Sequence, residues 1–163
     1  METIKSQDDY RYKELLEKAR NFCAFRERST HETKVKLLQI GANSLEAEKA
    51  LLQLKEEGFL SDLRFASVFV RGKFNQNQWG RAKIIMGLTA HRISKETISE
   101  ALQEIDNDKY IATLKSIVKK KLESLKGQTE FIVRGKTIGF CLGKGFESDL
   151  TQEILDSLLN RNL

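Results

Sequence analysis

The chain has 163 residues, no proline, 31% charged residues and a formal net charge of +5. This length suits one domain or a short array of small units, and it argues against several large domains. Abundant Leu, Lys, Glu and Ala without proline favour an all-α fold over a β-sandwich or a βαβ fold.

The sequence also bears on compartment and cofactors. It contains no run of about 18 consecutive apolar residues, which a membrane-spanning helix needs. The N-terminus lacks the basic start, apolar core and small-residue cleavage site of a signal peptide. Cys23 and Cys141 have no second cysteine or histidine at metal-ligand spacing, so we expect buried free thiols. These features predict a soluble, cytoplasmic protein without a metal or cofactor.

The first third of the chain predicts a flexible tail followed by three short helices. Residues 1–9 are polar and are expected to fray. Apolar residues then recur at helical spacing from Tyr10 to about Glu27. Two further helices follow, and capping residues predict their boundaries: Ser29 or Thr30, Gly41, Asn43 or Ser44, and Gly58.

A second set of three helices is expected in the middle of the chain. Ser61 and Ser94 are predicted to cap its first and third helices. Phe65 and Phe69 are expected in the core, and Trp79 stands where the second helix begins. The same apolar spacing returns after residue 108, which predicts a third set.

The chain repeats itself. Residues 41–51 align with residues 92–102 and with residues 145–155, and each copy has a polar N-cap and a closing apolar pair. Arg92 stands where the other copies have glycine; if this position needs a positive φ, arginine costs about 1 kcal/mol there. We therefore predict an all-α fold, an elongated and curved array of three three-helix repeats spanning residues 10–58, 59–107 and 108–163.

Positive charge gathers in the middle of the chain. Between Leu63 and Ile93 lie six basic residues and no acid, and a run of lysines follows in the third repeat. Such a surface suits a polyanion, either nucleic acid or an acidic protein groove; a solvated face without a partner is the alternative. The candidate binding residues are Arg64, Arg71, Lys73, Arg81, Lys83 and Arg92, and further candidates are Trp79, Lys119, Lys120 and Lys121.

Signals for catalysis are missing. His31 and His91 have no ligand-type residue at the spacing of a helical metal pair. Residues 139–145 are rich in glycine but lack the preceding strand and the hydroxyl residue of a phosphate-binding loop. Trp79 either stacks on a ligand or packs in the core. We expect neither enzymatic activity nor a small-molecule substrate.

Three segments resemble the RecX family of regulatory proteins. Residues 58–66, Gly-Phe-Leu-Ser-Asp-Leu-Arg-Phe-Ala, resemble its Gly-aromatic-Leu-Asp-Asp-x-Arg-Phe-Ala signature. Residues 80–84, with Leu88 and Ile93, resemble its Gly-x-x-Arg-Ile segment and the positions after it, and residues 140–146 are similar to its closing Leu-Leu-x-Arg-Gly-Phe segment. The chain departs from the family where Ser61 replaces an acid and Arg92 replaces a glycine.

The resemblance implies a function and its partners. A member of this family binds the RecA nucleoprotein filament and modulates, mainly by inhibition, recombinase and ATPase activity in DNA repair, DNA recombination and the SOS response. The expected partners are the RecA filament and single- and double-stranded DNA, and the expected state is a monomer. The alternative is a stand-alone helix-turn-helix protein in which the helix from Arg81 to Leu88 enters the major groove of DNA.

Overall fold

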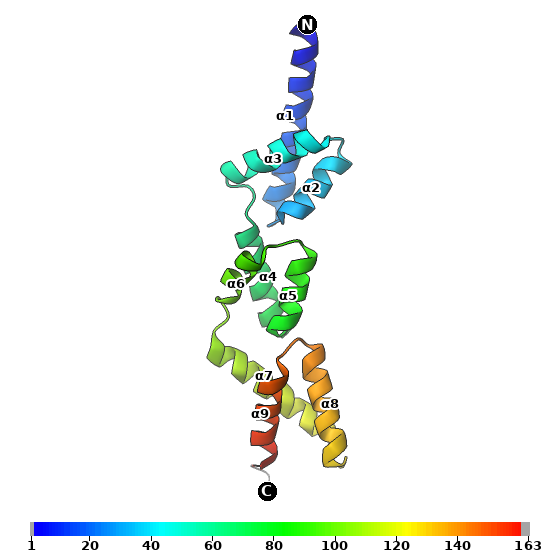
Figure 1. Ribbon diagram of the computed structural model, residues 1–163, viewed down its shortest axis with the longest axis vertical. Coiled ribbons are helices and arrows are strands. Elements are labelled where there is room, and N and C mark those ends of the chain that lie inside the picture. The colour runs from blue at the N-terminus through cyan, green and yellow to red at the C-terminus, as the bar shows by residue number, and fades with distance from the viewer. Residues whose placement is uncertain (1, 161–163) are drawn as a thin grey trace.

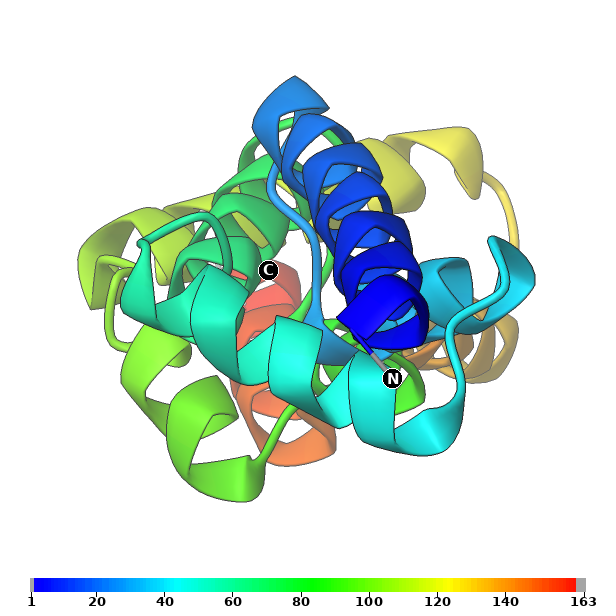
Figure 2. The same ribbon diagram turned by 90° about the horizontal axis from the view of Figure 1, so that it is seen from above.

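The structure, a computed structural model, describes residues 2–160, and all nine elements in that range are α-helices. They form three successive three-helix repeats in an elongated molecule with α1 and α9 at opposite ends (Figure 1). Seen along the long axis, the repeats lie over one another (Figure 2). The predicted fold class is confirmed. The helices are α1 Glu2–Phe25, α2 Thr30–Gln39, α3 Ser44–Glu56, α4 Asp62–Asn75, α5 Arg81–Ala90, α6 Lys95–Leu102, α7 Asn107–Ser124, α8 Glu130–Gly143 and α9 Ser148–Asn160.

Short polar side chains define the helix starts, as the sequence predicted. The Ser29 side chain accepts a hydrogen bond from the Glu32 N–H at the start of α2, and the Glu32 carboxylate accepts one from the Ser29 N–H. Asn43 makes the same capping box at the start of α3. Ser61 and Ser94 cap α4 and α6. Each of these bonds satisfies an amide that a helix start would otherwise leave without a partner.

The three aligned positions at the end of the second helix of each repeat share one backbone conformation. Gly41, Arg92 and Gly145 have φ values of 102°, 57° and 92°. This left-handed conformation reverses the chain toward the third helix, and only glycine adopts it without steric cost. The threefold repeat read from the sequence is therefore a repeat of backbone geometry as well.

The first helix begins earlier than the sequence predicted. Residues 2–9, expected to be a flexible tail, belong to α1, so the predicted helix start at Tyr10 is wrong. The segment is polar but contains neither proline nor glycine, and the Asp9 carboxylate lies 3.6 Å from the Lys13 ammonium one turn later. Polar residues of this kind continue a helix at little cost once a packed segment has formed it. Residue 1 and residues 161–163 lie outside the described range.

The repeats are joined in two different ways. Repeat 1 has its own apolar core, which α1, α2 and α3 build around Leu37 and Leu54. Repeats 2 and 3 share a single core that extends from Phe65 to Leu158. The second and third repeats therefore form one continuous packed unit, to which the first repeat is attached.

A close backbone approach fixes repeat 2 to repeat 3. The Gly80 N–H donates to the Lys144 carbonyl at 2.7 Å, and the Ala82 N–H donates to the Gly145 carbonyl at 3.0 Å. A Cβ atom on Gly80 would lie 2.2 Å from the Gly145 carbonyl carbon, so a side chain there would force the two segments apart. Gly80, which the resemblance singled out, is needed for this contact.

Polar contacts join repeat 1 to repeat 2. The Thr30 N–H donates to the Asp62 carboxylate at 2.7 Å, and the Arg64 guanidinium donates to the Glu27 carboxylate at 2.9 Å. The linker residues Leu60 and Phe59 pack into the core of repeat 1, but no residue belongs to both apolar cores among the described residues. The first joint thus combines polar contacts with the packing of the linker, whereas the second rests on one continuous buried core.

Candidate interaction surface

Arg64 and Arg71 share the outer face of α4 and are both ion-paired. The Arg64 guanidinium binds Glu27 of repeat 1, and the Arg71 guanidinium lies 2.7 Å from the Glu104 carboxylate just after α6. These four charged residues line one hollow of about 330 Å³ with Leu63, Ser67 and Val68. Two carboxylates neutralise the two arginines, so this face has mixed charge.

Arg81 is built into the joint between repeats 2 and 3. Its guanidinium carbon lies 3.8 Å from the centre of the Tyr110 ring and its Nη1 lies 3.3 Å from the Glu147 carboxylate. The buried Tyr110 hydroxyl accepts a hydrogen bond from the Arg81 N–H at 3.0 Å and donates one to Glu147 at 2.6 Å. Burial, followed by this bond to Glu147, raises the pKa of Tyr110 above its ordinary value. Arg81 therefore has a structural role at this joint.

Lys73 and Lys83 flank the ring of Trp79. Each ammonium lies 4.7 Å from the ring centre, and Lys73 also lies 5.4 Å from the centre of the Phe69 ring. The indole packs edge-on against Phe69 and borders the core, so it is half-buried and not detached from the fold. Neither lysine has a carboxylate within 4.0 Å among the described side chains. The structure brings together three of the predicted candidates here.

Arg92 lies apart from these groups. Its backbone holds the left-handed turn between α5 and α6, and its side chain is exposed. Phe65 is buried, as the sequence predicted, and His91 packs 4.9 Å from it, ring centre to ring centre. The six central cations thus do not form one uniform patch: three are ion-paired, two flank Trp79 and one stands alone.

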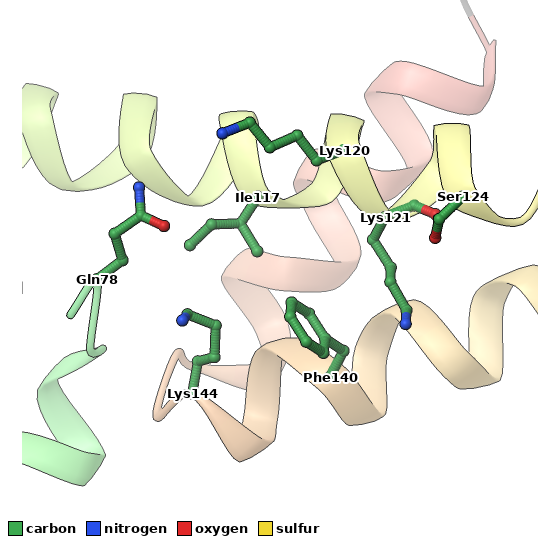
Figure 3. A pocket seen from close by; sticks show the side chains of 7 residues that line it. All are labelled: Gln78, Ile117, Lys120, Lys121, Ser124, Phe140 and Lys144. Carbon is green, nitrogen blue, oxygen red and sulfur yellow. The ribbon is translucent and has the colours of Figure 1, made fainter.

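A second basic site lies between α7 and α8 in repeat 3 (Figure 3). A hollow of about 310 Å³ opens there, and the side chains around it include two of the further candidates, Lys120 and Lys121. Lys119 lies on the same helix but outside the hollow. The full lining is Gln78, Ile117, Lys120, Lys121, Ser124, Phe140 and Lys144.

The sequence reasoning did not name the other five lining residues as binding candidates. Gln78 comes from the loop before α5, Phe140 from α8, and Lys144 from its C-cap. The Lys144 ammonium also donates to the Asn77 carbonyl at 3.2 Å, and the Lys83 ammonium lies 3.4 Å from the Gly143 carbonyl. Across the joint, Lys83 of repeat 2 therefore contacts repeat 3, and Lys144 of repeat 3 contacts repeat 2. The closing motif contained the signal for Phe140 and Lys144, but their contact with α7 could not be read from spacing.

A reactive thiol and a metal site each place requirements on the cysteines and on the metal-ligand residue types. Burial raises the pKa of the Cys23 and Cys141 thiols, which keeps them protonated. No group of three or more His, Cys, Asp and Glu side chains that could hold a metal ion occurs in the part of the chain that the structure describes. No helix within residues 2–160 is long and apolar enough to cross a membrane.

Fold and surface together define an all-α protein of three tandem three-helix repeats with basic sites on the second and third. Family profiles agree with this division. The profile for the second three-helix domain of RecX matches residues 61–102, and the profile for the third matches residues 108–155.

Curated relatives are similar over nearly the whole chain. "Regulatory protein RecX" of Prosthecochloris aestuarii is 30% identical, over 90% of this chain and 95% of its own length. The protein of that name from Clostridioides difficile is 28% identical, over 94% of this chain and 72% of its own length. The chain belongs to the RecX family of regulatory proteins.

Solved structures show the same fold at low identity. The crystal structure of RecX from Lactobacillus salivarius matches with a TM-score of 0.84 at 18% identity and covers 90% of this chain and 96% of that chain. A second crystal structure, of a regulatory protein RecX, matches with a TM-score of 0.79 at 21% identity and covers 93% and 77% of the two chains. The three-helix repeat array is thus shared with these structures.

Proposed function

We propose that this protein binds the RecA nucleoprotein filament and inhibits its recombinase and ATPase activities. The observation that supports this proposal best is the elongated array of three equivalent repeats, which provides successive similar surfaces along one axis (Figure 1). A helical polymer also presents successive equivalent surfaces, so an array can contact several subunits at once. A protein bound along the filament in this way obstructs both subunit exchange and access of a second DNA strand.

The contact centre in this proposal is the Lys73–Trp79–Lys83 cluster. A half-buried tryptophan with two ammonium groups, each 4.7 Å from its ring centre, combines an apolar anchor with charges that lack carboxylate partners among the described side chains. Aromatic anchors of this kind contribute most of the free energy at protein interfaces, and unpaired lysines steer acidic partners toward them. Arg64, Arg71, Arg92 and the lysines of α7 are separate, secondary contacts in this proposal, while Arg81 acts indirectly by holding repeats 2 and 3 together.

The helix-turn-helix alternative has less support in the geometry. Its recognition helix would be α5, whose exposed side chains include Ile85 and Met86, with Met86 72% exposed. The two cations of this helix, Arg81 and Lys83, contact the joint with repeat 3. A helix that reads the major groove instead presents polar and basic side chains to the base edges.

The test measures inhibition of RecA ATP hydrolysis on single-stranded DNA. The Lys73→Gln/Lys83→Gln double variant should raise the concentration needed for half-inhibition by about tenfold, which corresponds to about 1.4 kcal/mol. The matched control is Lys13→Gln/Lys18→Gln, because both of these exposed lysines pair with acids on α1 and lie far from the cluster. Equal inhibition by both double variants would show that the cluster is not part of the interface. Absence of inhibition by the parent protein would refute the proposed function.

A further inference from the structure

The lining of the hollow between α7 and α8 contains basic residues and no acidic one. Lys120, Lys121 and Lys144 belong to this lining, and the side chains of Lys121 and Lys144 lie between the two helices near Phe140 (Figure 3). The hollow on α4 differs, since Glu27 and Glu104 offset its two arginines. An anionic group that enters the α7–α8 hollow therefore meets lysines that have no carboxylate partner among the described side chains, and of these the Lys144 ammonium donates to the Asn77 carbonyl.

Phe140 gives the hollow a flat aromatic wall. The side chain points from α8 toward α7 (Figure 3) and is 44% exposed, although it stands among lysines. The Lys121 ammonium lies 4.7 Å and the Lys144 ammonium 6.0 Å from its ring centre. A ligand with a planar ring on Phe140 would have its anionic group within reach of both lysines. Gln78 and Ser124 add hydrogen-bonding groups at the edge.

We propose that this hollow binds an unpaired nucleotide of a single-stranded nucleic acid. The base stacks on Phe140 and the flanking phosphates bind Lys121 and Lys144, while Gln78 and Ser124 meet the polar edge of the base. Stacking of this kind needs an exposed base face, which a single strand offers and a duplex buries. The site acts without any recombinase, so it goes beyond the proposed function and does not depend on it.

A strand fits the surroundings better than a free nucleotide does. The lining residues come from the later turns of α7 and α8 and from a loop, so no helix N-terminus cradles a polyphosphate chain. The basic side chains instead continue from Lys144 to Lys83 across the joint. A phosphodiester backbone can follow such a row beyond the hollow, whereas a mononucleotide cannot use it.

Fluorescence anisotropy of the full chain with a labelled oligothymidylate of about 20 nucleotides, longer than the site of a typical single-strand binder, tests the stacking. Phe140→Ala should weaken binding by roughly 5- to 150-fold, and Phe140→Trp should restore it. The control is Phe131→Ala, because Phe131 lies on the same helix, is 88% exposed and does not line the hollow. Circular dichroism checks that helicity is unchanged. Equal losses for Phe131→Ala and Phe140→Ala, or no loss for Phe140→Ala, would overturn the proposal.

The lysines and the ligand source are tested in the same assay. Lys121→Gln/Lys144→Gln should make the dependence of log affinity on log salt shallower by about 1.4, since each phosphate contact to a single strand contributes about 0.7. Lys136→Gln, on the exposed part of α8 outside the hollow, should leave the slope unchanged. Duplex DNA of equal length and ATP should compete poorly. If duplex DNA or ATP competes at the same concentration as unlabelled single-stranded DNA, the assignment to an unpaired strand is wrong. This outcome does not depend on the result of the RecA assay.

Discussion

Arg92 occupies a backbone position that favours glycine, so this one residue lowers the stability of the repeat that contains it. Its φ of 57° is the conformation that Gly41 and Gly145 adopt at the aligned positions. A side chain with a Cβ atom is strained there by about 1 kcal/mol. The strain could be predicted from the sequence, because Arg92 aligns with glycine in the other two repeats. The binding role proposed for Arg92 would explain why a charged side chain, and not glycine, occupies this strained position.

Substitution of Arg92 separates strain from charge. Arg92→Gly removes both, whereas Arg92→Ala removes the charge and keeps the strain. We expect Arg92→Gly to be more stable than Arg92→Ala by about 1 kcal/mol, as measured by urea unfolding followed by circular dichroism. Equal stability of the alanine and glycine variants would contradict the strain that we assign to the positive φ at this position.

At the scale of the element, the joint between α5 and α7 to α9 depends on a buried hydroxyl. Tyr110 is 0% exposed, and its hydroxyl connects the first amide of α5 to the carboxylate of Glu147. Since both partners come from different segments, the hydroxyl contributes to the orientation of repeat 2 on repeat 3. Removal of the hydroxyl leaves the Arg81 N–H without its acceptor and leaves Glu147 with the Arg81 guanidinium as its remaining partner.

The Tyr110→Phe variant tests this role. It should lower the free energy of unfolding by about 1 kcal/mol and speed amide hydrogen exchange near Arg81 and Glu147, with repeat 1 unaffected. Tyr10→Phe is the matched control, because Tyr10 is 73% exposed. Unchanged exchange at Arg81 in the Tyr110 variant would show that the joint is held by the apolar core and the glycine contact alone.

The predicted N-caps at this scale were confirmed, although the start of α1 was placed too late, and contacts between distant elements were not predicted. N-caps such as Ser29 and Ser94 depend on residues within three positions, so the sequence determines them. The close approach of Gly80 to Gly145 depends on how two repeats stack, which no local pattern encodes. For the same reason the sequence predicted Arg81 as a binding residue, although the structure places it in ion-pair and ring contacts within the joint.

At the scale of the whole molecule, the two joints differ in what holds them. One core runs through repeats 2 and 3, whereas repeat 1 keeps a core of its own. Repeat 1 meets repeat 2 through the linker residues Phe59 and Leu60, which pack into that core, and through Asp62, Arg64 and their polar partners. Polar joints are weakened by salt and by competing water more than apolar ones are. An array with one firm joint and one polar joint can adjust its first repeat while the other two keep their relative position.

The elongated form was predictable because the repeat alignment fixed the number of units. The grouping of the basic residues was not, since it depends on which acids fold back onto them. Glu27 and Glu104 neutralise Arg64 and Arg71 from other elements, so an acid-free stretch of sequence did not become an acid-free surface. Lys73, Lys83 and the lysines of the α7–α8 hollow kept their charge available within the described part of the chain.

The most direct test of the account is cosedimentation of the protein with RecA filaments assembled on single-stranded DNA under ATP. We predict saturable pelleting with the filament and about tenfold weaker pelleting for Lys73→Gln/Lys83→Gln. On the proposal that each elongated copy contacts several subunits, saturation should occur at less than one copy per RecA subunit. DNA without RecA, which the hollow in repeat 3 can bind, serves as the reference. Pelleting that is no greater with the filament than with DNA alone would contradict the account.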